Sequence, residues 1–376
     1  MMLLDRGIVL EQPRTIHFGA HILPEVGRIA AAHAIRRTLV IASAANRGRV
    51  DALDLPGEVA IFDRVDREPD LAMLAAARAL AAAFDPQLVI GFGGGSAMDL
   101  AKLVAVLAGH AIPVQAIVGA GKAPRRRAML VQVPTTAGTG SEAGSRALVT
   151  DEANGAKLAV ESPHMIADAA VIDPALAVTV PAAITAETGI DALAHCVEAF
   201  TNVRAHPVID LYAREGIRLV GRYLPRAVEQ GDDLEARAGM ALAALYGGFC
   251  LGPVNTAGGH AVAYPLSTQH GIGHGRANAI IFPHMLAFNA PAAGDRTAEI
   301  ARLLGLAQPA AEQAIGPAAR GFCARLGIPM RLTAHGIGPE HVAAMAAEAA
   351  GIRRLLDNNP RPITGADIAG IYTAAL

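Results

Sequence analysis

The sequence has little charge for its length. Only 18% of the 376 residues are Asp, Glu, Lys or Arg, and the formal net charge is −2, which argues against an electrostatic nucleic-acid binder. Hydrophobic residues make up 52%, which excludes intrinsic disorder. No apolar run reaches the ~18 uninterrupted residues that span a bilayer. Asp5 and Arg6 interrupt the apolar start, leaving no secretory signal. We therefore expect a cytoplasmic protein with no membrane or nucleic-acid partner.

Cysteine is also scarce. Cys196, Cys250 and Cys323 are widely spaced, and no CxxC pair occurs. This pattern argues against a disulfide framework and against a thiolate zinc site. We expect all three to be small core residues.

The first half of the chain alternates short β-rich runs with alanine-rich helical stretches, which is typical of βαβ units and a parallel sheet. Ser96 stands where a helix N-cap is expected, with Asp99 in the first turn that follows. The expected strands are Thr38–Ala42, Val59–Phe62, Gln87–Phe92 and Met129–Val133, and the expected helices are Leu71–Phe84 and Ala97–Leu107.

The second half loses the β-branched runs after Pro181 and becomes rich in Ala and Leu. At roughly 150 residues per domain, the length suggests two domains. We place an α/β domain at 1–180 and an all-helical domain at 181–376. The expected helical segments are Ala186–Phe200, His206–Leu219, Leu234–Cys250, Asp295–Leu304, Ala310–Leu326 and Pro339–Ala350.

Two loops suggest nucleotide binding. Gly93-Gly94-Gly95-Ser96 lies between an expected strand and an expected helix, where backbone N–H groups can meet a phosphate; a tight turn is the alternative. The loop departs from the usual dinucleotide fingerprint. A second loop, Pro134–Glu142, carries hydroxyls and glycines after another strand. Two such loops at the carboxyl edge of one sheet favour a nucleotide site.

A metal site is the next candidate. Asp191 and His195 are four residues apart in an expected helix and so share a face. His260 and His274 follow in the helical half, and one carboxylate with three imidazoles suits Fe²⁺ or Zn²⁺. An ordinary solvated Asp–His pair is the competing interpretation, because the chain has 13 histidines.

At these residues the sequence resembles the iron-containing (group III) alcohol dehydrogenase family, nearly from end to end. The resemblance implies a Rossmann-like α/β nucleotide domain and an all-α metal-binding domain, in the architecture shared with dehydroquinate synthases, with catalysis in the cleft between them. The segments that carry it are GGGSAMDLAK at Gly93–Lys102, PTTAGTGSE at Pro134–Glu142, TGIDALAHCVEAF at Thr188–Phe200 and HAVAYPLSTQHGIGHGRANAI at His260–Ile280.

The resemblance also implies the site residues. The metal ligands fall on Asp191, His195, His260 and His274, and the fourteen-residue spacing of the last two rejects His270. The cofactor contacts fall on Gly93, Gly94, Gly95, Ser96, Asp99, Thr135, Thr136, Thr139, Ser141 and Lys157.

Three positions depart from the family pattern. Tyr264 stands where many members have a histidine proposed to relay the proton, so the catalytic residues expected are Tyr264 and His274. Ser43 replaces an aspartate that would repel a 2′-phosphate, which leaves NAD and NADP both open. Glu68-Pro69 replaces the more usual Asn-Pro, so one adenosine-side contact is expected to differ.

The expected activity is reversible hydride transfer between an alcohol and an aldehyde or ketone, with NAD(P) and the substrate oxygen on the metal. The alternative is a hydroxyacid-oxoacid transhydrogenase that retains its cofactor. A metal-free maleylacetate reductase and a fold without turnover fit the motifs less well. The apolar bias near Cys250–Gly259 favours small or medium aldehydes over heavily charged acids. The family resemblance implies a homodimer paired through Gly7–Glu11 or Thr15–Phe18.

Overall fold

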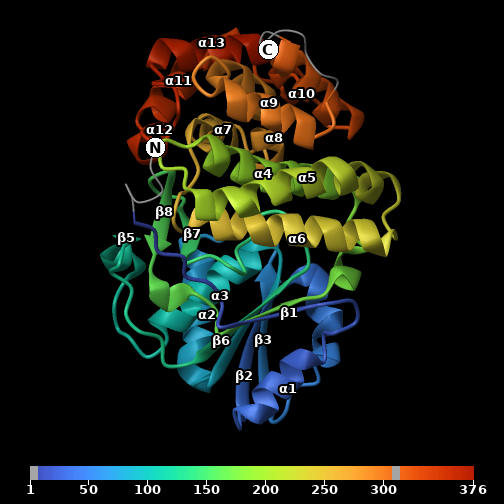
Figure 1. Cartoon of the computed structure of the whole chain (residues 1–376). Helices are drawn as coiled ribbons and strands as arrows, with labels where there is room; N and C mark the ends of the chain where they lie inside the picture. The colour runs from blue at the N-terminus through green and yellow to red at the C-terminus, as the bar shows by residue number, and fades with distance from the viewer. Residues whose placement is uncertain (1–6, 307–313) are drawn as a thin grey trace. The chain divides into compact units, whose positions relative to one another are not determined.

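The computed structural model describes residues 7–306 and 314–376, and the chain forms two compact units. The sheet unit comprises Leu10–Thr136 and Gly140–Val178. The helical unit comprises the described residues of Met1–Val9, Ala137–Thr139 and Thr179–Leu376. The expected combination of a parallel-sheet domain with an all-helical domain is confirmed (Figure 1).

The sheet unit is built on a six-stranded parallel sheet in the order β1-β9-β6-β4-β2-β3. After β2 the chain adds β3 on one side, and it then returns to place β4 on the other side. This reversal between β2 and β4 is the kind of position where open α/β sheets bind ligands. The strands are β1 Thr15–Phe18, β2 Arg37–Ser43, β3 Glu58–Val65, β4 Leu88–Gly93, β5 Gly119–Ala120, β6 Met129–Pro134, β7 Arg146–Asp151, β8 Ala156–Glu161 and β9 Ala169–Ile172.

The two faces of this sheet are covered by different helices. Residues that alternate along β2 divide between two cores, with Leu39 in the core of α2 and α3 and Val40 in the core of α1. Figure 1 shows α1 on the opposite side of the strands from α2 and α3. The helices of this unit are α1 Glu25–Ala32, α2 Leu71–Phe84 and α3 Gly95–Leu107, with the 3₁₀ segments η1 Ala44–Leu53, η2 Val114–Ile117, η3 Pro163–Met165 and η4 Pro174–Ala177.

Helix α2 shows why signals in the local sequence predicted helices and strands of this half correctly. Asp70 accepts a hydrogen bond from the Met73 N–H at 2.6 Å and caps the helix, and Asp85 ends it with a φ of 50°. Its buried side chains recur at helical spacing. The four expected strands and both expected helices of this half are therefore present, with bounds that differ by a few residues at most.

Two features of the sheet unit were not predicted. Strands β7 and β8 form an antiparallel hairpin in a separate three-stranded sheet with β5. Ser96 is not an N-cap: α3 begins at Gly95, Gly94 is the N-cap, and Asp99 lies beyond the first turn. The helix starts earlier because Gly94 adopts the extended conformation of a cap without needing a side chain.

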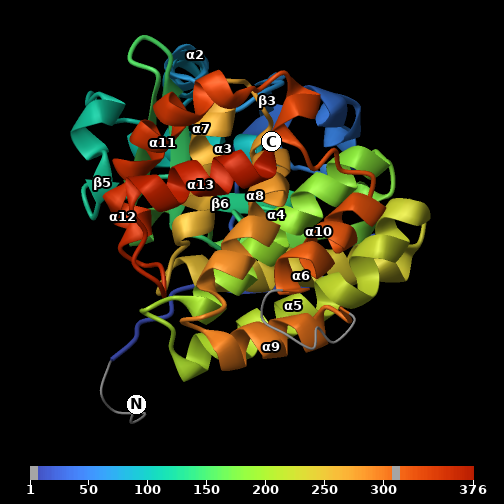
Figure 2. The ribbon, with the colours of Figure 1, turned by 90° about the horizontal axis from the view of Figure 1, so that it is seen from above.

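The helical unit is built around α4 (Ala182–Thr201), whose residues are buried along most of its length. Helices α4, α5 and α6 run side by side (Figures 1 and 2). All three cysteines are buried and free, which confirms their expected place in the core. The helices are α4 Ala182–Thr201, α5 Pro207–Glu229, α6 Leu234–Leu251, α7 Gly258–Thr268, α8 His274–Asn289, α9 Gly294–Leu303, α10 Ile315–Arg325, α11 Val342–Ala350, α12 Arg353–Leu356 and α13 Gly365–Ala375, with η6 Leu332–His335 and η7 Pro339–His341.

Some expected helix bounds change. The helix expected at His206–Leu219 continues to Glu229, with Pro225 inside it. The segment expected at Ala310–Leu326 begins partly outside the described residues, and α10 starts at Ile315. Within the described part of the chain, no helix combines the length and the apolar character that a membrane crossing requires.

Candidate metal centre and nucleotide loops

Gly93 and Gly94 form a side-chain-free turn between β4 and α3. A Cβ atom added at Gly93 would lie 2.8 Å from Ala97 Cβ and 3.2 Å from Ser43 Oγ. Among the described residues no side chain caps α3. The N–H groups of Gly95 and Ser96 lie in the first turn of α3 and have no carbonyl acceptor within the helix. The turn therefore suits the close approach of an anionic phosphate.

The carboxyl ends of β2 and β6 flank this turn. Asn46, which the sequence analysis missed, donates from Nδ2 to Ser43 Oγ at 2.7 Å and to Thr135 Oγ1 at 3.1 Å. A Cβ atom at Gly94 would lie 3.1 Å from Thr136 Oγ1. The structure thus brings Ser43, the glycine loop, Thr135 and Thr136 together at the reversal of strand order.

Asp99 and Ser141 are bonded to each other. Ser141 Oγ donates to Asp99 Oδ1 at 2.6 Å, and the Leu148 N–H donates to Asp99 Oδ2 at 2.9 Å. The fully buried Lys102 donates to Ser141 Oγ at 2.8 Å and to the Arg146 carbonyl oxygen at 2.9 Å. Burial lowers the pKa of Lys102 to about 8, while Asp99 and Glu142 oppose that shift. This network ties α3 to the second loop.

Thr139 and Lys157 lie on other segments of the chain. Ala137–Thr139 belongs to the helical unit, where a Cβ atom at Gly138 would lie 2.8 Å from Thr188 Cβ on α4. Lys157 lies on β8, and its Nζ forms an ion pair with Glu68 Oε2 at 2.6 Å. Glu68, which departs from the family pattern, therefore contacts a residue that is expected to reach the cofactor.

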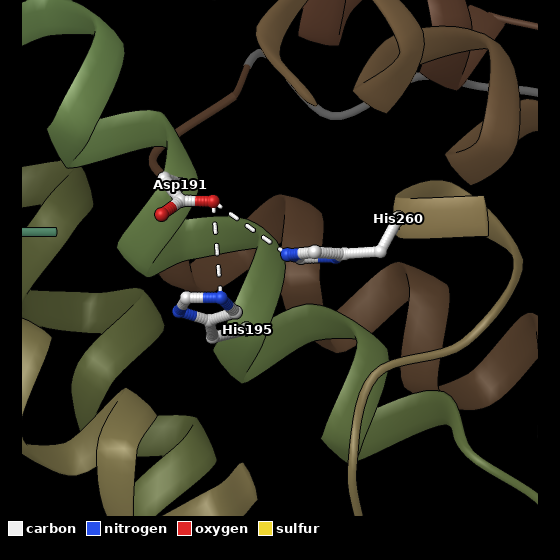
Figure 3. A group of neighbouring side chains, drawn as sticks. All are labelled: Asp191, His195 and His260. Carbon is white, nitrogen blue, oxygen red and sulfur yellow. Dashed lines mark ion pairs between the residues drawn. The ribbon is translucent and has the colours of Figure 1, made fainter. Parts of the chain in front are cut away.

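The helical unit brings the four expected metal ligands around one oxygen atom. Oδ1 of Asp191 lies 3.8 Å from His195 Nε2, 3.6 Å from His260 Nε2 and 3.5 Å from His274 Nε2. Asp191 and His195 come from α4, and His260 comes from α7 (Figure 3). Ligand atoms of Asp191, His195 and His260 all lie within 4.8 Å of one another.

These separations fit a metal ion. With bonds of roughly 2.0–2.2 Å, the ligand atoms of a tetrahedral site are about 3.4 Å apart, close to the values seen here. Burial lowers the pKa of His195 to about 4, which keeps that imidazole neutral and able to coordinate.

The charge of Asp191 also suits a cation. Burial by itself raises the pKa of Asp191, but the three surrounding histidines outweigh it and hold that pKa well below its usual range. The carboxylate is therefore ionised at neutral pH. A buried anion of this kind is stabilised by a nearby positive charge.

Glu198 holds His260 in a defined orientation. Its Oε1 accepts from His260 Nδ1 at 2.7 Å, and its Oε2 accepts from the N–H groups of Ala257 and His260 at the start of α7. Burial lowers the pKa of His260, but Glu198 and Asp191 outweigh it and raise the pKa to about 10. Glu198 thus holds Nδ1, and Nε2 is the His260 nitrogen that would be offered to a metal.

Asn278 completes the surroundings of the cluster. Its Nδ2 donates to Asp191 Oδ1 at 2.7 Å and lies 3.2 Å from Nε2 of both His260 and His274. Helical spacing could have revealed both added residues: Glu198 is seven residues after Asp191 on α4, and Asn278 is four after His274 on α8.

Tyr264 lies next to the cluster, whereas His270 does not. The Tyr264 ring centroid is 5.9 Å from that of His274. The Tyr264 hydroxyl accepts from Arg354 Nη2 at 3.3 Å. The His270 ring instead packs against His341 at 4.8 Å between centroids.

Comparison with known proteins gives matches over both units. The family model "Iron-containing alcohol dehydrogenase" matches residues 13–174, and "Fe-containing alcohol dehydrogenase family, C-terminal" matches residues 185–376. The chain is 36% identical over 367 residues to "Long-chain-alcohol dehydrogenase 1" of Geobacillus thermodenitrificans, covering 94% of this chain and 92% of that protein.

Solved structures agree with these matches. A 1,3-propanediol oxidoreductase superposes with a TM-score of 0.93 at 30% identity, over 99% of this chain and 100% of that one. A sulfoacetaldehyde reductase from Bifidobacterium kashiwanohense, crystallised in complex with NAD⁺, superposes with a TM-score of 0.89 at 29% identity, over 99% of both chains.

Proposed function

Because the chain belongs to the iron-containing alcohol dehydrogenase family, we propose that it is a metal-dependent, NAD(P)-linked alcohol dehydrogenase and aldehyde reductase. The observation that carries the proposal is that the Nε2 atoms of three histidines lie 3.5 to 3.8 Å from Asp191 Oδ1 in the helical unit. The NAD⁺ complex of a similar reductase supports a nicotinamide cofactor.

Each group of site residues has its own role in the proposed reaction. When bound, a divalent metal supplies Lewis acidity toward the substrate oxygen, and a nicotinamide cofactor supplies or accepts the hydride. Asp191, His195, His260 and His274 hold the metal, and Glu198 fixes the orientation of His260. The glycine turn before α3 binds the cofactor diphosphate through backbone N–H groups.

Proton transfer is assigned to Tyr264. In the reductive direction the carbonyl carbon receives a hydride and the carbonyl oxygen receives a proton. Tyr264 lies beside His274 and carries a hydroxyl that both donates and accepts. Arg354 donates to that oxygen, so this bond does not consume the hydroxyl proton.

Three further assignments belong to the proposal. Fe²⁺ is the proposed metal, with Zn²⁺ as the alternative, since both accept nitrogen and oxygen ligands. Ser43 places no charge beside the cofactor turn, so the proposal covers NAD and NADP. A homodimer is proposed through β1, which is one of the two edge strands of the six-stranded sheet.

The experiment that tests the proposed function is anaerobic loss of reduced-nicotinamide absorbance. The protein is reconstituted with Fe²⁺ or Zn²⁺ and supplied with NADH or NADPH and a panel of aldehydes and keto acids. Turnover is expected with at least one pair and is expected to fall to background when a strong chelator removes the metal. Turnover that survives complete metal removal would contradict the proposal.

The transhydrogenase alternative predicts different behaviour in the same assay. Hydride would pass from a hydroxyacid to an oxoacid without added cofactor, because the cofactor would stay bound. A dehydrogenase instead requires free NAD(P) in proportion to product formed. No contact among the described residues favours the alternative over the dehydrogenase.

Replacing Tyr264 with Phe is expected to lower turnover about 10- to 100-fold, because the proton donor is lost while the ring remains. Metal content should stay unchanged, since Tyr264 is not one of the four ligands. The measurements are steady-state turnover and bound metal per protein. Unchanged turnover would exclude Tyr264 from the proton path.

A further inference from the structure

Arg354 differs from the neighbouring arginines in what it contacts. It lies on the short helix α12, is exposed, and donates from Nη2 to the Tyr264 hydroxyl at 3.3 Å. Its guanidinium carbon also lies 5.7 Å from the centroid of the Tyr264 ring. Arg353, one residue earlier, forms an ion pair with Asp357 instead.

Arg354 forms no ion pair with a carboxylate among residues 7–306 and 314–376. A guanidinium is always charged and offers several N–H donors in a plane that matches a carboxylate. Its contact with a neutral phenol leaves donors available, so this position can accept an anion.

Arg354 also lies close to the candidate metal cluster. The Tyr264 centroid is 5.7 Å from the Arg354 guanidinium carbon and 5.9 Å from the His274 centroid, so those two groups are at most about 12 Å apart. Tyr264 itself is buried, while the guanidinium is exposed. Exposed arginines are common on protein surfaces, but Arg354 contacts Tyr264, the side chain assigned to proton transfer.

We propose that Arg354 binds the carboxylate of the substrate, so that the substrate is a short-chain aldehyde acid or the corresponding hydroxyacid. The inference rests on the proposed function, because it assumes that the reacting oxygen lies at the Asp191–His274 cluster. A four-carbon chain with bonds of roughly 1.5 Å is about 4 Å long, so it fits within the limit of about 12 Å set by the two contacts of Tyr264. The proposal replaces the preference for small or medium aldehydes over heavily charged acids that the apolar segment Cys250–Gly259 predicts.

The test compares 4-oxobutanoate with butanal, which has the same number of carbons and no charge. Replacing Arg354 with Met is expected to lower kcat/KM for 4-oxobutanoate about 10- to 100-fold, because a charged hydrogen bond is lost. For butanal kcat/KM should fall by a clearly smaller factor, because only the hydrogen bond to the Tyr264 hydroxyl is lost. Arg353→Met is the matched control, and it should leave both substrates unaffected.

A second measurement does not depend on turnover. Calorimetry with the metal-loaded protein measures binding of 4-hydroxybutanoate, which should weaken in Arg354→Met by the same factor and remain unchanged in Arg353→Met. If the wild-type protein binds 4-hydroxybutanoate and Arg354→Met does not, the inference is supported even when neither aldehyde is reduced. Failure to reduce either aldehyde would then count against the proposed function alone.

Several results would overturn the inference. One is an equal loss for both aldehydes in Arg354→Met, which would mean that Arg354 only positions the Tyr264 hydroxyl. Another is unchanged kcat/KM for 4-oxobutanoate in that variant. Absence of both turnover and 4-hydroxybutanoate binding in the wild-type protein would also overturn it.

Discussion

Replacing Asp191 with Asn is expected to lower turnover by about 10³-fold, which corresponds to roughly 4 kcal/mol of transition-state stabilisation. Asp191 Oδ1 is the atom around which the three histidine Nε2 atoms lie, at 3.5 to 3.8 Å. The substitution keeps the size of the side chain but removes its negative charge. Metal affinity should fall with turnover, because a neutral amide is a much weaker ligand for a divalent cation.

The measurements for Asp191→Asn are the metal dissociation constant, by competition with a chelator, and steady-state turnover at saturating metal. Asp210→Asn is the matched control, because Asp210 is also buried in the helical unit but pairs with Arg296 at 2.8 Å. That control should lose thermal stability and keep its metal affinity. Wild-type metal affinity in Asp191→Asn would refute the assignment of this ligand.

Replacing Gly94 with Ala is expected to weaken cofactor binding about 10- to 100-fold, which corresponds to roughly 1.4–2.8 kcal/mol. Gly94 is the N-cap of α3 and has φ −76° and ψ −172°, a conformation open to alanine. The added Cβ would lie 3.1 Å from Thr136 Oγ1 and would occupy the side of the turn where the diphosphate is proposed to approach. The loss should therefore arise from steric exclusion rather than backbone strain.

For Gly94→Ala, the readouts are the dissociation constants of NADH and NADPH by fluorescence titration and the KM of the cofactor that is used. Gly48→Ala provides the comparison in the same unit, since a Cβ atom there meets no described atom within 4 Å. Wild-type cofactor affinity in Gly94→Ala, with the fold intact, would place the diphosphate elsewhere.

The helices and strands that sequence analysis predicted well are those whose signals are local. Asp70 and Asp85 mark the two ends of α2, and the buried strand β4 appears as a continuous apolar run. The β7–β8 hairpin escaped prediction, because β8 is only partly buried along most of its length and the two strands depend on each other for their pairing. Ser96 was misplaced because glycine caps a helix nearly as well as serine does.

The residues of the candidate site also differ in whether a local sequence signal identifies them. Helical spacing alone places Asp191 and His195 on one face of α4, and it could have added Glu198 to that face. The family resemblance supplied His260 and His274, which spacing left open among the 13 histidines. Arg354 had no signal in the sequence, since its contact with Tyr264 joins segments 90 residues apart.

By itself, the sequence determined four of the strands and two of the helices in the first half, the helical character of the second half, the glycine turn and the one-face spacing of Asp191 and His195. Only the tertiary structure decided that His260 and His274 meet Asp191, that Glu198 holds His260, and that Arg354 reaches Tyr264. The physical reason is that periodicity records which face of an element is apolar. Which faces then meet depends on packing between elements distant in sequence, and the chemistry of this site is made by those contacts.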